Sequence, residues 1–285
     1  MKAIKRRIKS VESTKQITKA MELVASSKLR KAKEKAENSR PYFNALYDTM
    51  CEIQSENKNF FSPFTRKGKK GNILLIVIAG DRGLAGGFNS NIIKLAQSRI
   101  NELTADGRSA VEIVAVGKKS VEYFEKHGYN LLGKYTNVGE TLTLGLARQI
   151  SEKIVNPYLK GKFERVEIFY TDFASAISQV PVSKPVLPLN IEDKPKTGAA
   201  PLPIYEPSAE EVFNMIVPKY ISGIIFGAIV DSFASEQAAR RNAMENASDN
   251  ADAILGELSL KYNRARQASI TQELTEIVSG ASAQE

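Results

Sequence analysis

The sequence predicts an α/β fold in which a long antiparallel two-helix coiled coil, formed by the two ends of the chain, carries an inserted open α/β sheet domain. Three observations lead to this prediction. Apolar residues recur every three or four positions over residues 1–55 and 208–285, as they do on one face of a helix. Residues 72–195 instead alternate short β-branched runs with helical segments, the pattern of an open sheet covered by helices. A proline-rich stretch precedes the second long helix.

The C-terminal segment 208–285 is the longest expected helix. Only Pro218 interrupts it. Its apolar residues keep a helical period: Ile221, Ile224, Ile225, Ala228, Met244, Ala247, Ala251, Ile254 and Leu258. At 1.5 Å per residue, roughly 75 residues make a rod of ~110 Å. A compact domain of this size is not that wide, so most of the rod is expected to lie outside one. Such a helix suits a lever, a shaft or a strut better than a catalytic device.

A narrow apolar stripe also runs along residues 1–55, at a spacing of three or four: Ile4, Ile8, Val11, Ile17 or Thr18, Met21, Val24 and Leu29. Lysine and arginine occupy most of the other faces. A stripe this narrow, with small neighbouring residues, is typical of a coiled-coil seam. Pro41 is expected to kink or end the most regular part of this helix.

The central elements follow from changes in the apolar pattern. Residues 72–79 (NILLIVIA) form a continuous β-branched run, which is typical of a strand buried on both faces. Further strands are expected at 111–116, 165–171 and 177–186, and helices at 91–103, 118–127 and 142–159. Seven prolines between 181 and 207 then indicate an extended connector.

The two terminal helices flank one insert, so their inner ends, near Cys51 and Glu210, are expected to lie close together. Facing residue numbers would then sum to about 261 in an antiparallel pair. Met1 would face the region of Leu260, and roughly 25 residues, ~37 Å of helix, would extend beyond it. This overhang carries four large apolar residues: Ile270, Leu274, Ile277 and Val278. We expect something outside this chain to enclose it.

Composition excludes several kinds of site. Cys51 is the only cysteine and His127 the only histidine, which excludes a disulfide framework, a cysteine–histidine metal cluster and most histidine-based triads. The net charge of +8 suits acidic partners without choosing among them. The longest apolar runs fall short of the ~20 residues of a membrane span. We therefore expect no cofactor, no metal site, no membrane span and no catalytic activity in this chain by itself.

The glycine-rich segment 80–89 (GDRGLAGGFN) lies between a predicted strand and a predicted helix, where loops that hold phosphates are found. Its spacing matches neither the dinucleotide fingerprint nor the P-loop. The favoured interpretation is a tight turn in which Asp81 and Asn89 cap backbone groups. The alternative is a small-ligand enzyme that uses this loop.

Basic residues gather in the first helix: Lys28, Arg30, Lys31, Lys33 and Lys35. Such a run could bind nucleic acid, but no aromatic residue interleaves it. A solvated coiled-coil face or a surface for an acidic protein partner is favoured. A basic coiled-coil adaptor or nucleic-acid-binding protein is the alternative function.

Four segments, at 4–32, 81–91, 235–251 and 262–283, resemble the gamma subunit of F-type ATP synthase. They read IKRRIKSVESTKQITKAMELVASSKLRKA, DRGLAGGFNSN, SEQAARRNAMENASDNA and YNRARQASITQELTEIVSGASA. The resemblance implies a central rotor shaft inside a hexamer of alternating alpha and beta subunits. It implies a foot beside the c-ring and the epsilon subunit, and a peripheral location at the cytoplasmic face of the cell membrane. It gives no catalytic role to the glycine-rich loop.

The resemblance also implies contact residues. Those that pass the acidic lever loop of beta are Lys19, Met21, Glu22 and, on the facing helix, Arg240. The numbers of Met21 and Arg240 also sum to 261. The polar catch with beta comprises Arg266, Gln267, Thr271, Gln272 and Glu276. The apolar bearing comprises Ile270, Leu274, Ile277 and Val278, and the foot on the c-ring comprises Tyr205, Glu206 and Pro207.

Overall fold

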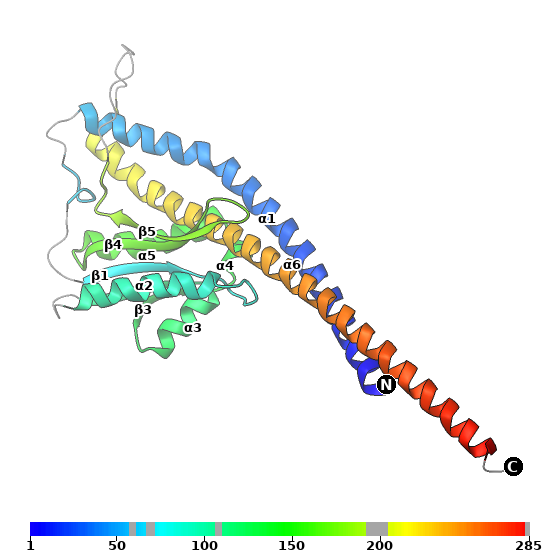
Figure 1. Ribbon diagram of the computed structural model, residues 1–285. Coiled ribbons are helices and arrows are strands. Elements are labelled where there is room, and N and C mark those ends of the chain that lie inside the picture. The colour runs from blue at the N-terminus through cyan, green and yellow to red at the C-terminus, as the bar shows by residue number, and fades with distance from the viewer. Residues whose placement is uncertain (57–60, 67–71, 106–109, 192–204, 283–285) are drawn as a thin grey trace. The chain divides into compact units, whose positions relative to one another are not determined.

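The computed structural model describes residues 1–56, 61–66, 72–105, 110–191 and 205–282 (Figure 1). They form two compact units, one of Met1–Ser26 with Arg240–Glu285 and the other of Ser27–Ala239. We call the first the coil unit and the second the sheet unit. The predicted connector prolines Pro195, Pro201 and Pro203 lie outside the described residues.

The two long helices are α1, Lys2–Glu56, and α6, Ala209–Ser282, and both run through both units. α1 continues past Pro41, so of the two predicted effects of this proline, a kink or an end, the helix does not end there. A proline inside a helix removes one backbone hydrogen bond, which the rest of a long, packed helix can offset. Ser208 caps the start of α6, where its Oγ accepts a hydrogen bond from Glu211 N at 3.2 Å.

Five strands form one mixed sheet in the order β3-β2-β1-β4-β5. Their bounds are β1 Asn72–Ile78, β2 Val111–Val116, β3 Asn130–Tyr135, β4 Phe163–Phe173 and β5 Gln179–Leu187. The first four pair in parallel and β5 is antiparallel to β4. This confirms the predicted fold class. β3 was not predicted, because it is a short edge strand that is interrupted by Gly133 and only partly buried.

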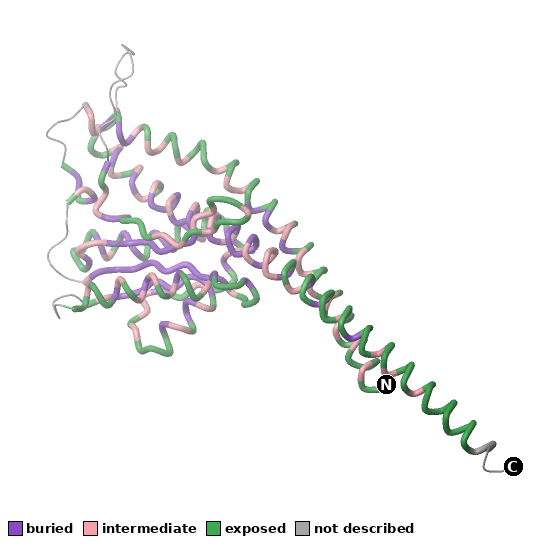
Figure 2. Tube along the Cα trace, viewed as in Figure 1, coloured by how far each residue is buried: buried purple, intermediate pink, exposed green. Residues whose placement is uncertain are grey.

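Helices cover both faces of this sheet (Figure 1). Their bounds are α2 Phe88–Thr104, α3 Lys118–Lys126, α4 Val138–Thr141 and α5 Leu144–Leu159. One cluster of buried apolar side chains joins β1 to α2 and α3. A second cluster joins β1 to α5, α1 and α6. Alternate residues of β1, such as Leu75 and Ile76, lie in different clusters. The strand is therefore buried on both faces, as its continuous apolar run predicts (Figure 2).

The first half of α6 is a core helix of the sheet unit. Phe213, Val217, Ile221 and Ile225 are completely buried against the sheet and α5. By length and composition alone, a stretch of α6 would be apolar enough to cross a membrane, and half of it is buried inside the protein. Packing against the sheet accounts for that apolar character.

The pairing register of the two long helices differs from the predicted one. In the coil unit, Lys15 Nζ lies 2.5 Å from Asp252 Oδ1 and Thr18 Oγ1 lies 2.8 Å from Ser248 Oγ. These residue numbers sum to 267 and 266 instead of 261. α1 ends at Glu56, one residue beyond the predicted 1–55, so the error lies in taking Cys51 as the residue that faces Glu210. Met1 therefore faces the region of Arg266, not Leu260, and the overhang is about six residues shorter than predicted.

The coiled-coil seam also differs in detail. Ile17 is 60% and Val24 54% exposed, whereas Thr18 is half-buried and Ala25 is 1% exposed. On α6, Ile254 is 44% exposed, so it is not a seam residue. The observed seam of α1 keeps a strict heptad spacing: Ile4, Ile8, Val11, Lys15, Thr18, Glu22 and Ala25. The prediction placed Val24 in the seam and left Ile17 or Thr18 open. The neighbouring smaller residues Ala25 and Thr18 occupy these positions.

Asp231, on α6 in the sheet unit, provides a test of this packing. Burial raises the pKa of its carboxyl group, as does the nearby charge of Asp172, while Arg40 and Lys184 oppose the shift. A carboxyl group with a raised pKa in the folded state destabilises the fold at neutral pH, and this effect disappears as the pH falls through its ordinary pKa. We expect Asp231→Asn to stabilise the protein at pH 7. The gain in the free energy of unfolding should shrink towards zero in denaturation experiments below pH 4. A gain independent of pH would contradict the raised pKa of Asp231.

Candidate functional site

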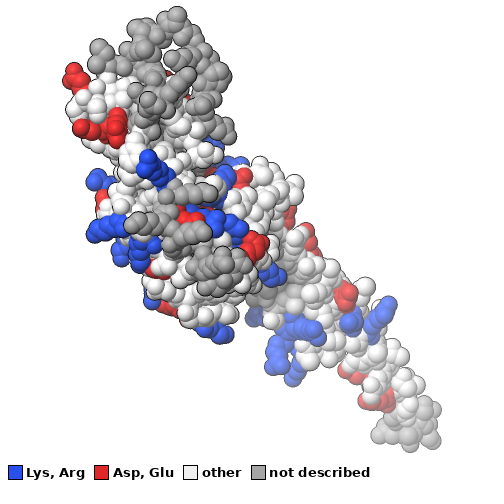
Figure 3. Space-filling model, turned by 90° about the vertical axis from the view of Figure 1, so that its left-hand side faces the viewer, with Lys and Arg blue, Asp and Glu red and all other residues white. Residues whose placement is uncertain are grey.

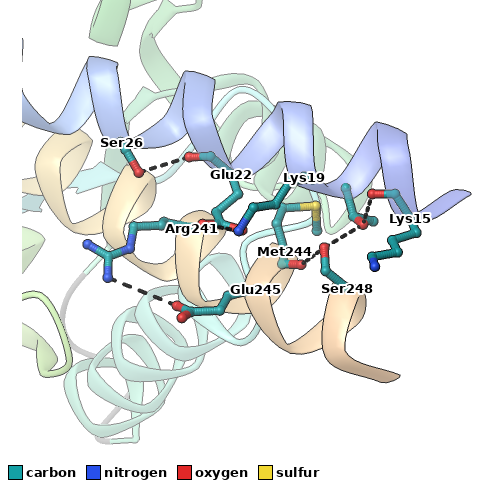
Figure 4. Close-up of polar contacts among 9 residues, drawn as sticks. Lys15, Lys19, Glu22, Ser26, Arg241, Met244, Glu245 and Ser248 are labelled. Atoms are coloured by element: carbon teal, nitrogen blue, oxygen red, sulfur yellow. Dashed lines mark hydrogen bonds and ion pairs between the residues drawn. The ribbon is translucent and has the colours of Figure 1, made fainter. Parts of the chain in front are cut away.

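The predicted contact residues around Met21 lie in a polar cluster of the coil unit, which we call the neck cluster: Lys19, Glu22, Arg241 and Glu245 (Figure 4). Lys19 Nζ donates to the two carboxylate oxygens of Glu22 at 3.0 and 3.2 Å. This hydrogen bond raises the pKa of Lys19, and the charges of Glu245 and Asp249 act in the same direction. Arg241 Nη2 lies 4.0 Å from Glu245 Oε2. The neck cluster therefore presents mixed charges.

Met21 and Arg240 do not face one another as predicted. Met21 is half-buried, and the observed register places it opposite the region of Glu245. Arg240 is buried at 7% exposure, whereas the side chain of Arg241 is 38% exposed. The two arginines are neighbours in the sequence, which does not indicate which of them is accessible. The structure shows that Arg241 is the more accessible of the two.

The predicted tip residues are exposed in this chain. Ile270 is 48%, Leu274 58%, Ile277 68% and Val278 64% exposed. They recur every three or four positions, and so form one apolar stripe on the helix. Figure 2 shows this end of α6 as exposed. Polar residues between them bond along the same helix, as Gln272 Nε2 does to Glu276 Oε1 at 2.9 Å. An exposed apolar stripe of this kind marks a surface that binds a partner.

Most of the remaining predicted contact residues are also exposed. Arg266, Gln267, Thr271 and Glu276 are exposed. Tyr205 is half-buried against the core of the sheet unit, while Glu206 and Pro207 are exposed. The three foot residues therefore lie directly before the first turn of α6.

The glycine-rich loop is a tight turn, as favoured above. Gly80 N donates to Asn89 Oδ1 at 2.8 Å, and Asn89 Nδ2 donates to Arg82 O at 3.1 Å. Asp81 Oδ1 accepts two backbone N–H groups, from Lys118 at 2.9 Å and Asn137 at 2.8 Å. A cavity of only 20 Å³ remains beside this loop. That is about the space of one water molecule, so this cavity cannot hold a nucleotide.

Three lysines of the basic run bind other parts of the chain. Lys28 Nζ lies 2.7 Å from Glu140 Oε1, Lys35 Nζ donates to Leu142 O, and Lys33 Nζ lies 4.7 Å from the centre of the Phe173 ring. Burial lowers the pKa of Lys35. Acidic side chains also lie among the basic ones on the face shown in Figure 3. These contacts do not favour the nucleic-acid alternative, which needs a continuous and accessible basic surface.

Comparison with known proteins decides the family. A family model described as ATP synthase matches residues 1–284. The ATP synthase gamma chain of Ruminococcus albus is 53% identical over 282 residues, which cover 99% of this chain and 97% of that protein. The chain belongs to the ATP synthase gamma family. A second gamma-family relative, the ATP synthase gamma chain of Alkaliphilus metalliredigens, is 44% identical over 289 residues, covering 99% of this chain and 98% of that one. A gamma-family chain is part of a complex that synthesises ATP.

Solved structures agree with this family. A chain from the central stalk and c-ring of Tetrahymena thermophila mitochondrial ATP synthase matches with a TM-score of 0.59 and 28% identity, over 81% of this chain and 99% of that one. A chain of Euglena gracilis mitochondrial ATP synthase matches with a TM-score of 0.62, over 99% of this chain and 93% of that one. At 18% identity, the second match shows the fold alone.

Proposed function

We propose that this chain is the central rotor shaft of an F-type ATP synthase. It couples ion-driven rotation of the c-ring to conformational changes at catalytic sites on the beta subunits. The observation that carries this proposal is the match to gamma chains along almost the whole sequence, both long helices included. The exposed apolar stripe of α6 supports it, because a helix with such a stripe requires a surrounding partner.

The mechanism in this proposal is mechanical. A helix pair with different side chains on each face contacts the three beta subunits of a ring differently. Each orientation of the pair then favours a different beta conformation, and rotation shifts the populations among them. The chain itself holds no catalytic group in this scheme, because bond making and breaking occur on beta.

We assign partners to three parts of the chain. Residues 1–55 and 208–285 form the shaft inside the alpha–beta hexamer, and 72–195 form the foot domain beside the c-ring and the epsilon subunit. The neck contacts with beta come from Lys19, Met21 and Glu22, while Arg240, which is only 7% exposed, supports the neck from within the helix pair. The catch comes from Arg266, Gln267, Thr271, Gln272 and Glu276. The bearing comes from Ile270, Leu274, Ile277 and Val278, and the foot from Tyr205, Glu206 and Pro207. The assembly is held peripherally at the cytoplasmic face of the cell membrane.

Purification of the tagged chain from its own cells tests this function. Co-purification of alpha-type and beta-type ATPase subunits in a stable complex is the expected result. Nucleic acid that co-purifies without ATPase subunits, and dissociates steeply as the salt concentration rises, would overturn the proposal in favour of the basic adaptor.

The proposed bearing and neck are expected to differ in their tolerance of change. Deletion of residues 279–285 should leave assembly with alpha and beta largely intact, because the apolar stripe up to Val278 remains. Arg240→Glu should lower the yield of complex strongly, since breaking the contacts of a buried charge costs about 3 kcal/mol or more. The matched control is Arg241→Glu, whose side chain is 38% exposed. Native gels of the three variants check this, and loss of assembly after the deletion would contradict the bearing.

A further inference from the structure

One end of the sheet binds α6 through paired hydrogen bonds within the sheet unit. Ser232 Oγ accepts a hydrogen bond from Thr171 N at 2.9 Å, and Ser235 Oγ donates one to Thr171 O at 3.1 Å. Both serines lie on α6, and Thr171 lies in β4. Because both backbone groups of one strand residue bond to the same helix, α6 is fixed to the carboxyl end of β4.

Two glycines let α6 approach the neighbouring loops closely. A Cβ atom at Gly80 would lie 2.8 Å from the carboxyl carbon of Glu236. A Cβ atom at Gly139 would lie 2.4 Å from the Phe233 ring. Glu236 is 7% exposed, so the loop after β1 and the short helix α4 both cover this part of α6. A larger residue at Gly139 would overlap the Phe233 ring, and one at Gly80 would displace the Glu236 carboxylate.

The same short segment binds α1. Lys28 Nζ on α1 lies 2.7 Å from Glu140 Oε1, and Lys35 Nζ donates a hydrogen bond to Leu142 O. We call residues 137–142 the bridge segment. It contacts α6 through Gly139 and α1 through Glu140 and Leu142, so it joins both long helices to the sheet unit.

A single carboxylate orders the bridge segment. Asp81 Oδ1 accepts a hydrogen bond from Asn137 N at 2.8 Å, where the bridge segment begins, and one from Lys118 N at 2.9 Å, where α3 begins. Asn137 has a positive φ of 58°, a conformation that costs free energy unless neighbouring contacts impose it. Hydrogen bonds to a charged acceptor are among the stronger ones in proteins. Asp81 thus ties the end of β1 to both segments.

We propose that Asp81 is a positioning residue that holds the bridge segment against α1 and α6. The sheet and the adjoining parts of the long helices, residues 27–56 and 209–239, then turn as one body. The statement about turning rests on the proposed rotor function, whereas the ordering of the bridge segment does not. Three lysines of the basic run hold α1 against the bridge segment and β4, and we assign them this role instead of binding a partner: Lys28, Lys33 and Lys35.

Hydrogen exchange in the assembled complex tests the ordering. In Asp81→Ala, backbone amides of the bridge segment should exchange about tenfold faster, because losing one charge-assisted hydrogen bond shifts local opening by about that factor. Asp81→Asn should lie between the wild type and Asp81→Ala, since the side-chain carbonyl oxygen still accepts both hydrogen bonds but without the charge that strengthens them. Glu122→Ala is the matched control: Glu122 pairs with Lys118 and Lys119 at the same end of the sheet unit without touching the bridge segment. Equal exchange in Asp81→Ala and Glu122→Ala would overturn the proposal.

The second part of the proposal is that the sheet and the adjoining parts of the long helices turn as one body. We test it by measuring the torsional stiffness of single rotating complexes that carry a probe on the sheet unit. Asp81→Ala should lower the stiffness relative to Glu122→Ala, and Asp81→Asn should restore part of it. If Asp81→Ala does not assemble, Lys28→Glu should soften the shaft and the added change Glu140→Lys should restore it. Faster exchange with unchanged stiffness would overturn the mechanical role. Faster exchange in a chain that binds no beta subunit would overturn the rotor function and leave the ordering by Asp81 intact.

Discussion

Replacing Met21 by lysine is expected to lower the number of ions pumped per ATP hydrolysed while ATP hydrolysis continues. Met21 is half-buried and directly precedes Glu22 of the neck cluster in the sequence, and our proposal places it against an acidic loop of beta. A new ammonium group would bond to those carboxylates in some rotor orientations and not in others. Such a charged hydrogen bond contributes about 1.5–3 kcal/mol, enough to slow release of one orientation about tenfold or more.

The measurement is ATP-driven ion pumping in membrane vesicles, divided by the rate of ATP hydrolysis. Met21→Leu conserves volume and adds no charge, so it should behave like the wild type. High salt should partly restore pumping in Met21→Lys, because salt screens a new ion pair near the surface. An unchanged ratio of pumping to hydrolysis in Met21→Lys would refute the placement of Met21 at the neck.

Two glycines of α6, four residues apart, are expected to respond to alanine with opposite signs. A Cβ atom at Gly223 would lie 2.2 Å from the Phe43 ring on α1, whereas nothing lies within 4 Å of one at Gly227. Gly223→Ala should therefore destabilise the protein by about 1–3 kcal/mol through overpacking. Gly227→Ala should stabilise it by about 0.5–1 kcal/mol, because alanine loses less backbone entropy than glycine in a helix.

Urea denaturation of the purified chain checks both signs in one experiment. Gly227→Ala is the matched control for helix propensity, because both glycines lie inside α6. The double variant Phe43→Leu with Gly223→Ala should recover part of the lost stability, since the smaller side chain relieves the overlap. If Gly223→Ala and Gly227→Ala changed stability in the same direction, the close approach of α1 and α6 at this point would be wrong.

The architecture could be predicted from the sequence because its strongest signals are local. A helical apolar period at both ends and a β-branched run at 72–79 need no knowledge of distant contacts. Capping by Asn89 was also predictable, since short polar side chains in a glycine-rich turn bond to nearby backbone. Asp81 was predicted to cap backbone groups, but its two donors could not be named, because Lys118 N and Asn137 N come from 37 and 56 positions away in the sequence.

The pairing register could not be predicted for a physical reason. Residues 51–56 (CEIQSE) contain no glycine or proline that would end a helix, so the extent of α1 depends on packing within the sheet unit. Taking Cys51, instead of the end of the helix, as the residue that faces Glu210 shifted every predicted facing pair by about five residues. The sequence left Ile17 or Thr18 open as the seam residue, and Thr18 occupies the seam, where it bonds to Ser248 on the other helix.

The composition of the observed seam has an elastic consequence. In the coil unit, Thr18, Ala25, Ser248 and Ala251 occupy positions where leucine or isoleucine would normally interlock. Each missing buried methylene removes roughly 0.8 kcal/mol of apolar stabilisation, and small side chains leave shallow ridges between the helices. Such a pair resists bending, since both helices are continuous, but offers little resistance to a small twist of one helix about the other. We therefore expect the coil unit to twist more readily than a coiled coil whose seam is filled by leucine and isoleucine.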